Sequence, residues 1–81
     1  MALEQSNTHD RATSGWREVV VARRRALGLR QEDLADLAGV SHRFVQSIEA
    51  GKPTIRLDKL TAVLHALGLH LEVVPDRQGR P

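Results

Sequence analysis

The sequence contains no cysteine, and its only aromatic residues are Trp16 and Phe44. Without cysteine the chain can form neither a disulfide framework nor a zinc–thiolate site. So few aromatic residues argue against the stacking platforms that bind single-stranded nucleic acid. The four histidines are scattered and lack the paired spacing of a metal site. We therefore expect no metal and no other cofactor.

Long apolar runs are also missing, since none approaches the roughly 20 residues that span a bilayer. Residues 1–13 are polar and of mixed charge, without the apolar core of a secretory signal. No nucleophile–base pair or glycine-rich phosphate loop stands out, so an enzyme is not expected. These absences predict a cytoplasmic protein that neither enters a membrane nor catalyses a reaction.

With 81 residues and a net charge of +2, the chain has room for one small domain and is mildly basic. A domain of this size buries only about 60% of its unfolded surface, so it gains much from oligomerisation. The charge permits nucleic-acid binding without requiring it, and the placement of the basic residues matters more.

The first predicted helix follows a polar N-terminal segment. We expect residues 1–13 to be a flexible tail, 14–75 to form the domain, and 76–81 to be a second flexible tail. Ser14 is the predicted N-cap of this helix, which ends at Gly28. Its inward residues at helical spacing are predicted to be Trp16, Val19, Val20, Arg23 and Leu27. The arginine run 23–25 is expected on a solvated face, with Arg23 the candidate to turn inward and pair with Glu49.

Three further helices are predicted. The second spans Gln31–Ala38 and the third Ser41–Ala50, each closed by a glycine that accepts the left-handed cap conformation. Ser41 is the predicted N-cap of the third. A fourth helix stops at Gly68 and presents one apolar face, made of Leu57, Leu60, Val63, Leu64 and Leu67.

Residues 69–74 alternate in the manner of a β-strand, with Leu69, Leu71 and Val73 on one face. A single strand needs a partner for its backbone donors and acceptors, and no other segment has a strand pattern. The simplest partner is the same strand of a second copy, so the sequence predicts a homodimer with dimerisation residues Leu69, Leu71 and Val73.

Residues 31–51, QEDLADLAGVSHRFVQSIEAG, form the most informative segment. Ala35 is small where the next helix crosses it, Gly39 turns the chain sharply, and Val45 and Ile48 fill the wedge between two short helices. Together these features predict a helix-turn-helix, whose second helix enters the major groove of double-stranded DNA.

The motif residues Gln31, Ala35, Gly39, Val45 and 48–51 (Ile-Glu-Ala-Gly) also match a known pattern. Over residues 16–69 the chain resembles the phage-repressor-like (Cro/C1-type, XRE) helix-turn-helix family. The resemblance implies an all-α, lambda-repressor-like bundle of four to five helices. One departure is Arg30, where the family often has a Ser or Thr cap.

Residues 51–75, GKPTIRLDKLTAVLHALGLHLEVVP, are similar to the HipB-type antitoxins, small repressors that pair with a HipA-like kinase toxin. In that subgroup a short C-terminal β-strand pairs across the dimer. The resemblance implies an autoregulating transcriptional repressor and antitoxin of a HipBA-type toxin–antitoxin pair. Two alternatives stay open: a stand-alone phage-type transcriptional regulator, and an antitoxin that acts mainly by binding its toxin.

The DNA contacts are predicted from positions around the third helix. The candidate base readers in the major groove are His42, Arg43, Gln46 and Ser47, with Arg43 suited to guanine and Gln46 to adenine. For His42 a plain surface histidine is an equal alternative. Phosphate contacts are predicted for Gln31, Lys52, Arg56 and Lys59. A dimer would read a palindromic operator with its recognition helices about 34 Å apart.

Overall fold

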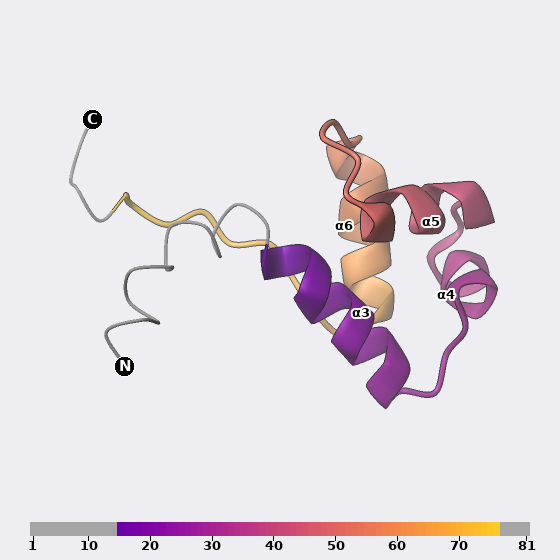
Figure 1. The fold of residues 1–81 in the computed structure, drawn as a ribbon. Helices are drawn as coiled ribbons and strands as arrows, with labels where there is room; N and C mark the ends of the chain where they lie inside the picture. Colours follow the sequence, from indigo (N-terminus) through magenta and orange to yellow (C-terminus); the bar gives the residue numbers. More distant parts are fainter. Residues whose placement is uncertain (1–14, 77–81) are drawn as a thin grey trace.

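The computed structural model describes residues 15–76, and the helices in this range form a small bundle (Figure 1). Their bounds are α3 Trp16–Ala26, α4 Gln31–Ala38, α5 His42–Ala50 and α6 Leu57–Ala66. Helix α4 packs against both α5 and α6, and α3 packs against α5. The predicted tail 1–13, the Ser14 cap and residues 77–81 lie outside the described residues.

The two central helices have the predicted bounds because each end carries a local signal. Helix α4 ends at Gly39, which adopts the left-handed conformation with φ +73°. Ser41 then caps α5 by accepting a 3.0 Å hydrogen bond from the Phe44 amide to its Oγ. Helix α5 ends at Gly51, also left-handed, with φ +97°. The glycine-punctuated turns therefore fix how α5 lies against α4.

The core is formed by aliphatic residues from all the described helices. Ala35 is buried beneath α5, where its small side chain lets the two helices of the motif approach closely. Val45 and Ile48 fill the wedge between those helices, as predicted from the sequence. Phe44 is half-buried and packs against this core. The buried hydrophobic residues are Val20, Leu34, Ala35, Val45, Ile48, Leu60, Val63, Leu64 and Leu67.

Four predicted inward positions are wrong. On α3 the buried positions are Val20 and Arg24, one helical turn apart, so Val19, Arg23 and Leu27 fall on the exposed side. On α6, Leu57 is the first residue of the helix and is 65% exposed. The predicted pairing of Arg23 with Glu49 is also wrong, since Arg24 is the arginine that turns inward.

Residues 69–76 leave α6 as an extended segment that runs past the start of α3 and away from the helices (Figure 1). Leu69 packs against the core, whereas Leu71 is exposed and Val73 is 99% exposed. Within residues 15–76 no strand is present, and no backbone hydrogen bond joins residues 70–75 to another segment. A single chain offers no partner strand, so the predicted strand and its dimer pairing stay predictions.

None of the helices between residues 15 and 76 has both the length and the apolar character to cross a membrane.

Candidate nucleic-acid interface

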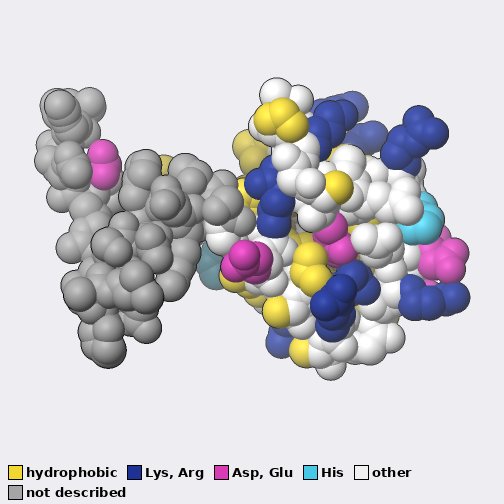
Figure 2. Space-filling view, viewed as in Figure 1, with side chains coloured by type: hydrophobic (Ala, Val, Ile, Leu, Met, Phe, Trp, Pro, Cys, Tyr) yellow, Lys and Arg dark blue, Asp and Glu magenta, His cyan; other side chains and the backbone are white. Residues whose placement is uncertain are grey.

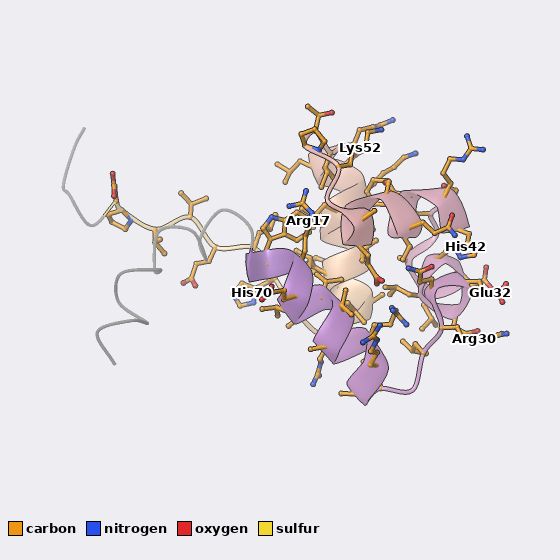
Figure 3. All side chains as sticks on the ribbon, viewed as in Figure 1. Arg17, Arg30, Glu32, His42, Lys52 and His70 are labelled. Carbon is orange, nitrogen blue, oxygen red and sulfur yellow. The ribbon has the colours of Figure 1, made fainter. Side chains whose placement is uncertain are left out.

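The outward face of α5 carries the predicted base readers. His42, Arg43 and Gln46 are exposed, while Val45 and Ile48 on the opposite face are buried in the core. His42 projects from the outer end of the helix (Figure 3). Ser47 differs from these three, since it is half-buried and its Oγ donates a 2.8 Å hydrogen bond to the Phe44 carbonyl. The helix therefore exposes three polar side chains, whereas the fourth predicted base reader, Ser47, is already hydrogen-bonded to the backbone.

A shallow groove beside α5 gathers the predicted phosphate-binding cations. Lys52, Arg56 and Lys59 line it, together with Phe44, Ser47, Thr54 and Ile55. Lysine and arginine side chains gather over the upper edge of the helical body, near α5 and the turn that follows it (Figure 2). The motif thus places a concave basic surface directly next to the exposed face of α5.

Arg56, one of the groove cations, already forms an ion pair with Asp58. Its guanidinium lies 2.7 Å from Asp58, and both side chains are exposed. The hydrogen bond from Arg56 lowers the pKa of Asp58 below its ordinary value. An exposed pair of this kind is weak and exchanges readily for another anion, so Arg56 stays available to a phosphate.

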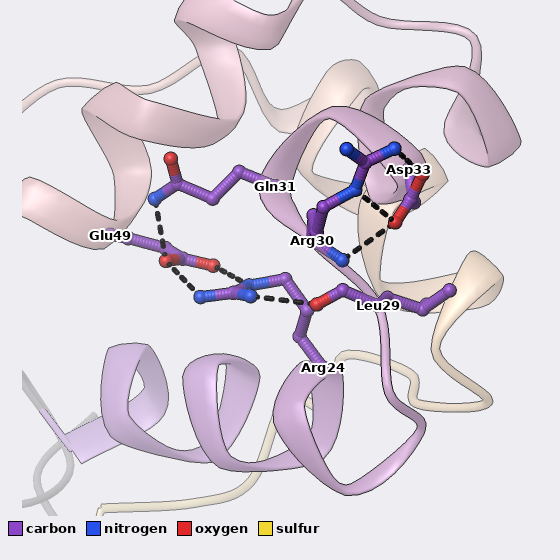
Figure 4. A network of polar contacts seen from close by, with 6 residues as sticks. All are labelled: Arg24, Leu29, Arg30, Gln31, Asp33 and Glu49. Atoms are coloured by element: carbon purple, nitrogen blue, oxygen red, sulfur yellow. Dashed lines mark hydrogen bonds and ion pairs between the residues drawn. The ribbon is translucent and has the colours of Figure 1, made fainter.

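Beneath α5 a buried polar network ties the motif to α3 (Figure 4). Arg24 Nε and Nη2 donate to the two carboxylate oxygens of Glu49 at 2.8 and 3.0 Å, and its Nη1 donates to the Leu29 carbonyl at 2.8 Å. The amide nitrogen of Gln31 donates to Glu49 Oε1 at 2.9 Å. Burial alone would raise the pKa of Glu49, but the hydrogen bonds from Arg24 and Gln31, together with the positive charges of Arg24 and Arg25, outweigh it and lower the pKa.

The network changes the role expected of Gln31. Its amide was predicted to contact a phosphate, and the structure places it half-buried and bound to Glu49. An amide group has two N–H donors, and only one is used by Glu49. A phosphate contact from Gln31 therefore stays a prediction, with the start of α4 already oriented by the network.

Comparison with known proteins identifies this arrangement. The helix-turn-helix family HTH_3 matches residues 21–74. The chain is also 40% identical over 57 residues to a protein of Sinorhizobium fredii (strain NBRC 101917 / NGR234), named as the uncharacterized HTH-type transcriptional regulator y4mF. That stretch covers 70% of this chain and 75% of the relative. The chain belongs to the helix-turn-helix family. This membership confirms the family part of the resemblance seen in the sequence.

In this helix-turn-helix the Arg30 departure is compensated locally. Arg30 stands at the N-cap of α4, and its backbone amide donates a 2.8 Å hydrogen bond to Asp33 Oδ2. The Arg30 guanidinium also donates to both oxygens of Asp33, at 3.0 and 3.1 Å. Hydrogen bonds from the Arg30 side chain and backbone lower the pKa of Asp33 to about 2. Asp33 thus supplies the carboxylate half of a capping box, while the Arg30 side chain, which has no acceptor, cannot supply the half that a Ser or Thr would.

Arg17 makes contacts that we did not predict from the sequence. Its guanidinium lies over the Trp16 ring, 4.4 Å from the ring centroid, and its Nε donates a 2.9 Å hydrogen bond to the Ile48 carbonyl. A second nitrogen, Nη2, donates to the carbonyl of Lys52. The sequence gives no local signal for this contact, because Arg17 and Ile48 are 31 positions apart.

No metal ligands accompany these elements in the described range: residues 15–76 bring together no cluster of three or more His, Cys, Asp or Glu side chains that could hold an ion.

Proposed function

We propose that this helix-turn-helix protein is a sequence-specific, double-stranded DNA-binding transcriptional repressor that acts as a homodimer on a palindromic operator. The observation that carries the proposal is the free face of α5, where His42, Arg43 and Gln46 are exposed next to a groove with three cations. In this proposal α5 enters the major groove, with Arg43 on guanine and Gln46 on adenine. Ser47 contributes as an acceptor through its hydroxyl oxygen, or as a donor by exchanging its bond to Phe44.

The phosphate backbone is assigned to the groove. Lys52, Arg56 and Lys59 supply the salt-sensitive part of the affinity, which carries no sequence information. Gln31 adds a contact near the start of α4. This division predicts two separable effects: changes on the α5 face alter specificity, whereas changes in the groove alter affinity on every DNA sequence.

Fluorescence anisotropy tests the proposal. Labelled DNA from the region upstream of the gene is titrated with protein at physiological salt, against a scrambled duplex of equal length. We expect binding to the upstream DNA to be at least about 10³-fold tighter. Arg43→Ala should reduce that ratio, whereas Arg25→Ala, at an exposed arginine of α3 outside the groove and the α5 face, should leave it unchanged. An equal loss on both duplexes for Arg43→Ala would refute its base-reading role.

The homodimer is proposed to form through the segment after α6. Residues 70–75 have no backbone partner within residues 15–76, and Leu71 and Val73 are exposed although they are apolar. Pairing with the same segment of a second copy would satisfy the backbone and cover these side chains. Val73→Asp should lower the dimer fraction in sedimentation equilibrium more than Val74→Asp, which lies on the other face of the predicted strand. Equal effects would argue against this pairing.

A second candidate function is that of an antitoxin with a HipA-like kinase toxin as its partner. Leu37, on the exposed side of α4, is 63% exposed and lies outside the core, which favours a protein contact at this position. The repressor and antitoxin roles are compatible within one chain. Purification from native extract under gentle conditions distinguishes them: a co-purifying kinase-like protein supports the antitoxin, and a homodimer alone supports the stand-alone regulator.

A further inference from the structure

The backbone of Lys52 is held on both sides, which is unusual for a turn residue whose side chain lines a groove. Its amide donates a 3.1 Å hydrogen bond to the Ser47 carbonyl, and its own carbonyl accepts from Arg17. Gly51 before it is left-handed, and Pro53 after it has a fixed φ and no N–H. Of these restraints, only Arg17 comes from a distant part of the chain.

Arg17 is itself well placed to act as this restraint. Its guanidinium lies on the Trp16 ring and spans two acceptors with different nitrogens, the Ile48 and Lys52 carbonyls. The Ile48 carbonyl belongs to the last turn of α5, where a cation is favoured by the helix dipole, and it also accepts a long, 3.4 Å hydrogen bond from the Gly51 amide. A rigid planar guanidinium that bridges both carbonyls fixes the turn relative to the helix. Figure 3 shows Arg17 pointing from α3 toward this turn, with Lys52 beyond it.

We infer that Arg17 is a positioning residue for DNA binding, which holds the Lys52 backbone so that the lysine ammonium in the groove contacts a DNA phosphate. The inference rests on the proposed function and deepens it, because it names what orders one of the phosphate contacts. Arg17 touches no DNA in this scheme. Arg17 bonds α5 in its last turn, at the Ile48 carbonyl, whereas the Ser41 cap holds the first turn, which carries His42 and Arg43.

The salt dependence of DNA binding tests this positioning role in the full-length protein. Arg17→Met keeps an aliphatic stem on Trp16 and removes both donors. The slope of log K against log salt concentration should fall in magnitude by about 0.9, the equivalent of one phosphate contact. The ratio of operator to scrambled affinity should not change. A wild-type slope in this variant would overturn the inference.

Arg23→Met is the matched control for a purely structural effect. Arg23 also lies on α3, and its Nε also donates to a carbonyl at the end of a helix, that of Leu67 after α6, at 2.8 Å. It should leave the salt slope unchanged, and an equal fall in slope for both variants would overturn the inference. Arg17→Lys provides a variant that keeps the charge and most of the stem but replaces the two separate, rigidly spaced guanidinium nitrogens with a single one. It should lower the slope as Arg17→Met does, and full retention of the slope would contradict positioning by the guanidinium.

A double-mutant comparison with Lys52→Gln separates positioning from direct contact. If Arg17 acts through Lys52, then Arg17→Met should not lower the slope further once the ammonium is gone. A second fall of about 0.9 would show that Arg17 contacts a phosphate itself and would overturn the inference. These slopes can be measured on the scrambled duplex as well. Failure of the proposed function is seen separately, as equal binding of operator and scramble by the wild-type protein.

Discussion

Among single side-chain replacements, Arg24→Met is the one that we expect to lower the free energy of unfolding most. Arg24 donates two hydrogen bonds to Glu49 and one to the Leu29 carbonyl, and the two charged side chains are only 9% and 8% exposed. Arg24→Met would leave the Glu49 carboxylate buried with Gln31 as its remaining partner. Breaking a buried ion pair in this way costs about 3–5 kcal/mol, a large part of the stability of a small domain.

Urea unfolding followed by circular dichroism measures this loss. With an m value of about 1 kcal/mol per molar urea for a domain of this size, the midpoint should fall by about 3 M or more. Arg23→Met is the control, because it removes one hydrogen bond of an exposed arginine to the Leu67 carbonyl and should cost about 1 kcal/mol. A loss below about 1 kcal/mol for Arg24→Met would refute the view that the network holds α3 on the motif.

The pH dependence gives an independent test with a definite sign. In the wild type the pKa of Glu49 is lowered, so its contribution to stability is fully present above its ordinary pKa and is lost as pH falls through the lowered value. In Arg24→Met burial remains while the main hydrogen-bond donor is gone, so the pKa of Glu49 should rise above its ordinary value. The variant then gains stability relative to wild type on acidification. A stability gap that does not narrow between pH 7 and about pH 4 would contradict this reasoning.

Three further predictions concern the ends of α4 and α5. Ser41→Ala removes the acceptor for the Phe44 amide and should lower the free energy of unfolding by about 1 kcal/mol in urea titration. Gly39→Ala should cost about 1–2 kcal/mol in the same assay. A Cβ there meets nothing within 4 Å, so the penalty would come from the φ of +73° alone. The pKa of Asp33, lowered to about 2, predicts a contribution that is present above about pH 4 and lost toward pH 2. In Asp33→Asn this titration is absent, so the melting temperature should depend less on pH between about pH 4 and pH 2 than in the wild type.

The motif helices could be predicted from the sequence because their ends are determined locally. Gly39 and Gly51 adopt positive φ, and Ser41 bonds a backbone amide three residues ahead, so each signal lies directly beside the helix that it bounds. The buried face of α5 followed from the same short segment, since Val45 and Ile48 are one turn apart. The candidate base readers then followed as the remaining positions of the helix.

The error on α3 arose because its rotation about its own axis is set by packing. Three successive arginines point in three different directions around the helix. Which of them turns inward depends on how the helix is rotated against the core, and no capping residue indicates that rotation. Val20 and Arg24 lie one turn apart and share the buried side, and a phase anchored on Val20 would have selected Arg24. The Arg17 contact is harder still, since it joins residues 31 and 35 positions apart and depends on where α3 begins.

The contacts of α3 also change how the charge of the chain should be interpreted. Arg17 and Arg23 bind carbonyls at helix ends, and Arg24 is neutralised by Glu49, so these three cations serve the fold. The charges that face the proposed DNA surface are instead Arg43 on α5 and the three cations of the groove. A count of basic residues would therefore overstate the phosphate contacts of this protein. If the three groove cations each neutralise one phosphate, the salt slope is about −2.7 per protomer, whatever the number of arginines on α3.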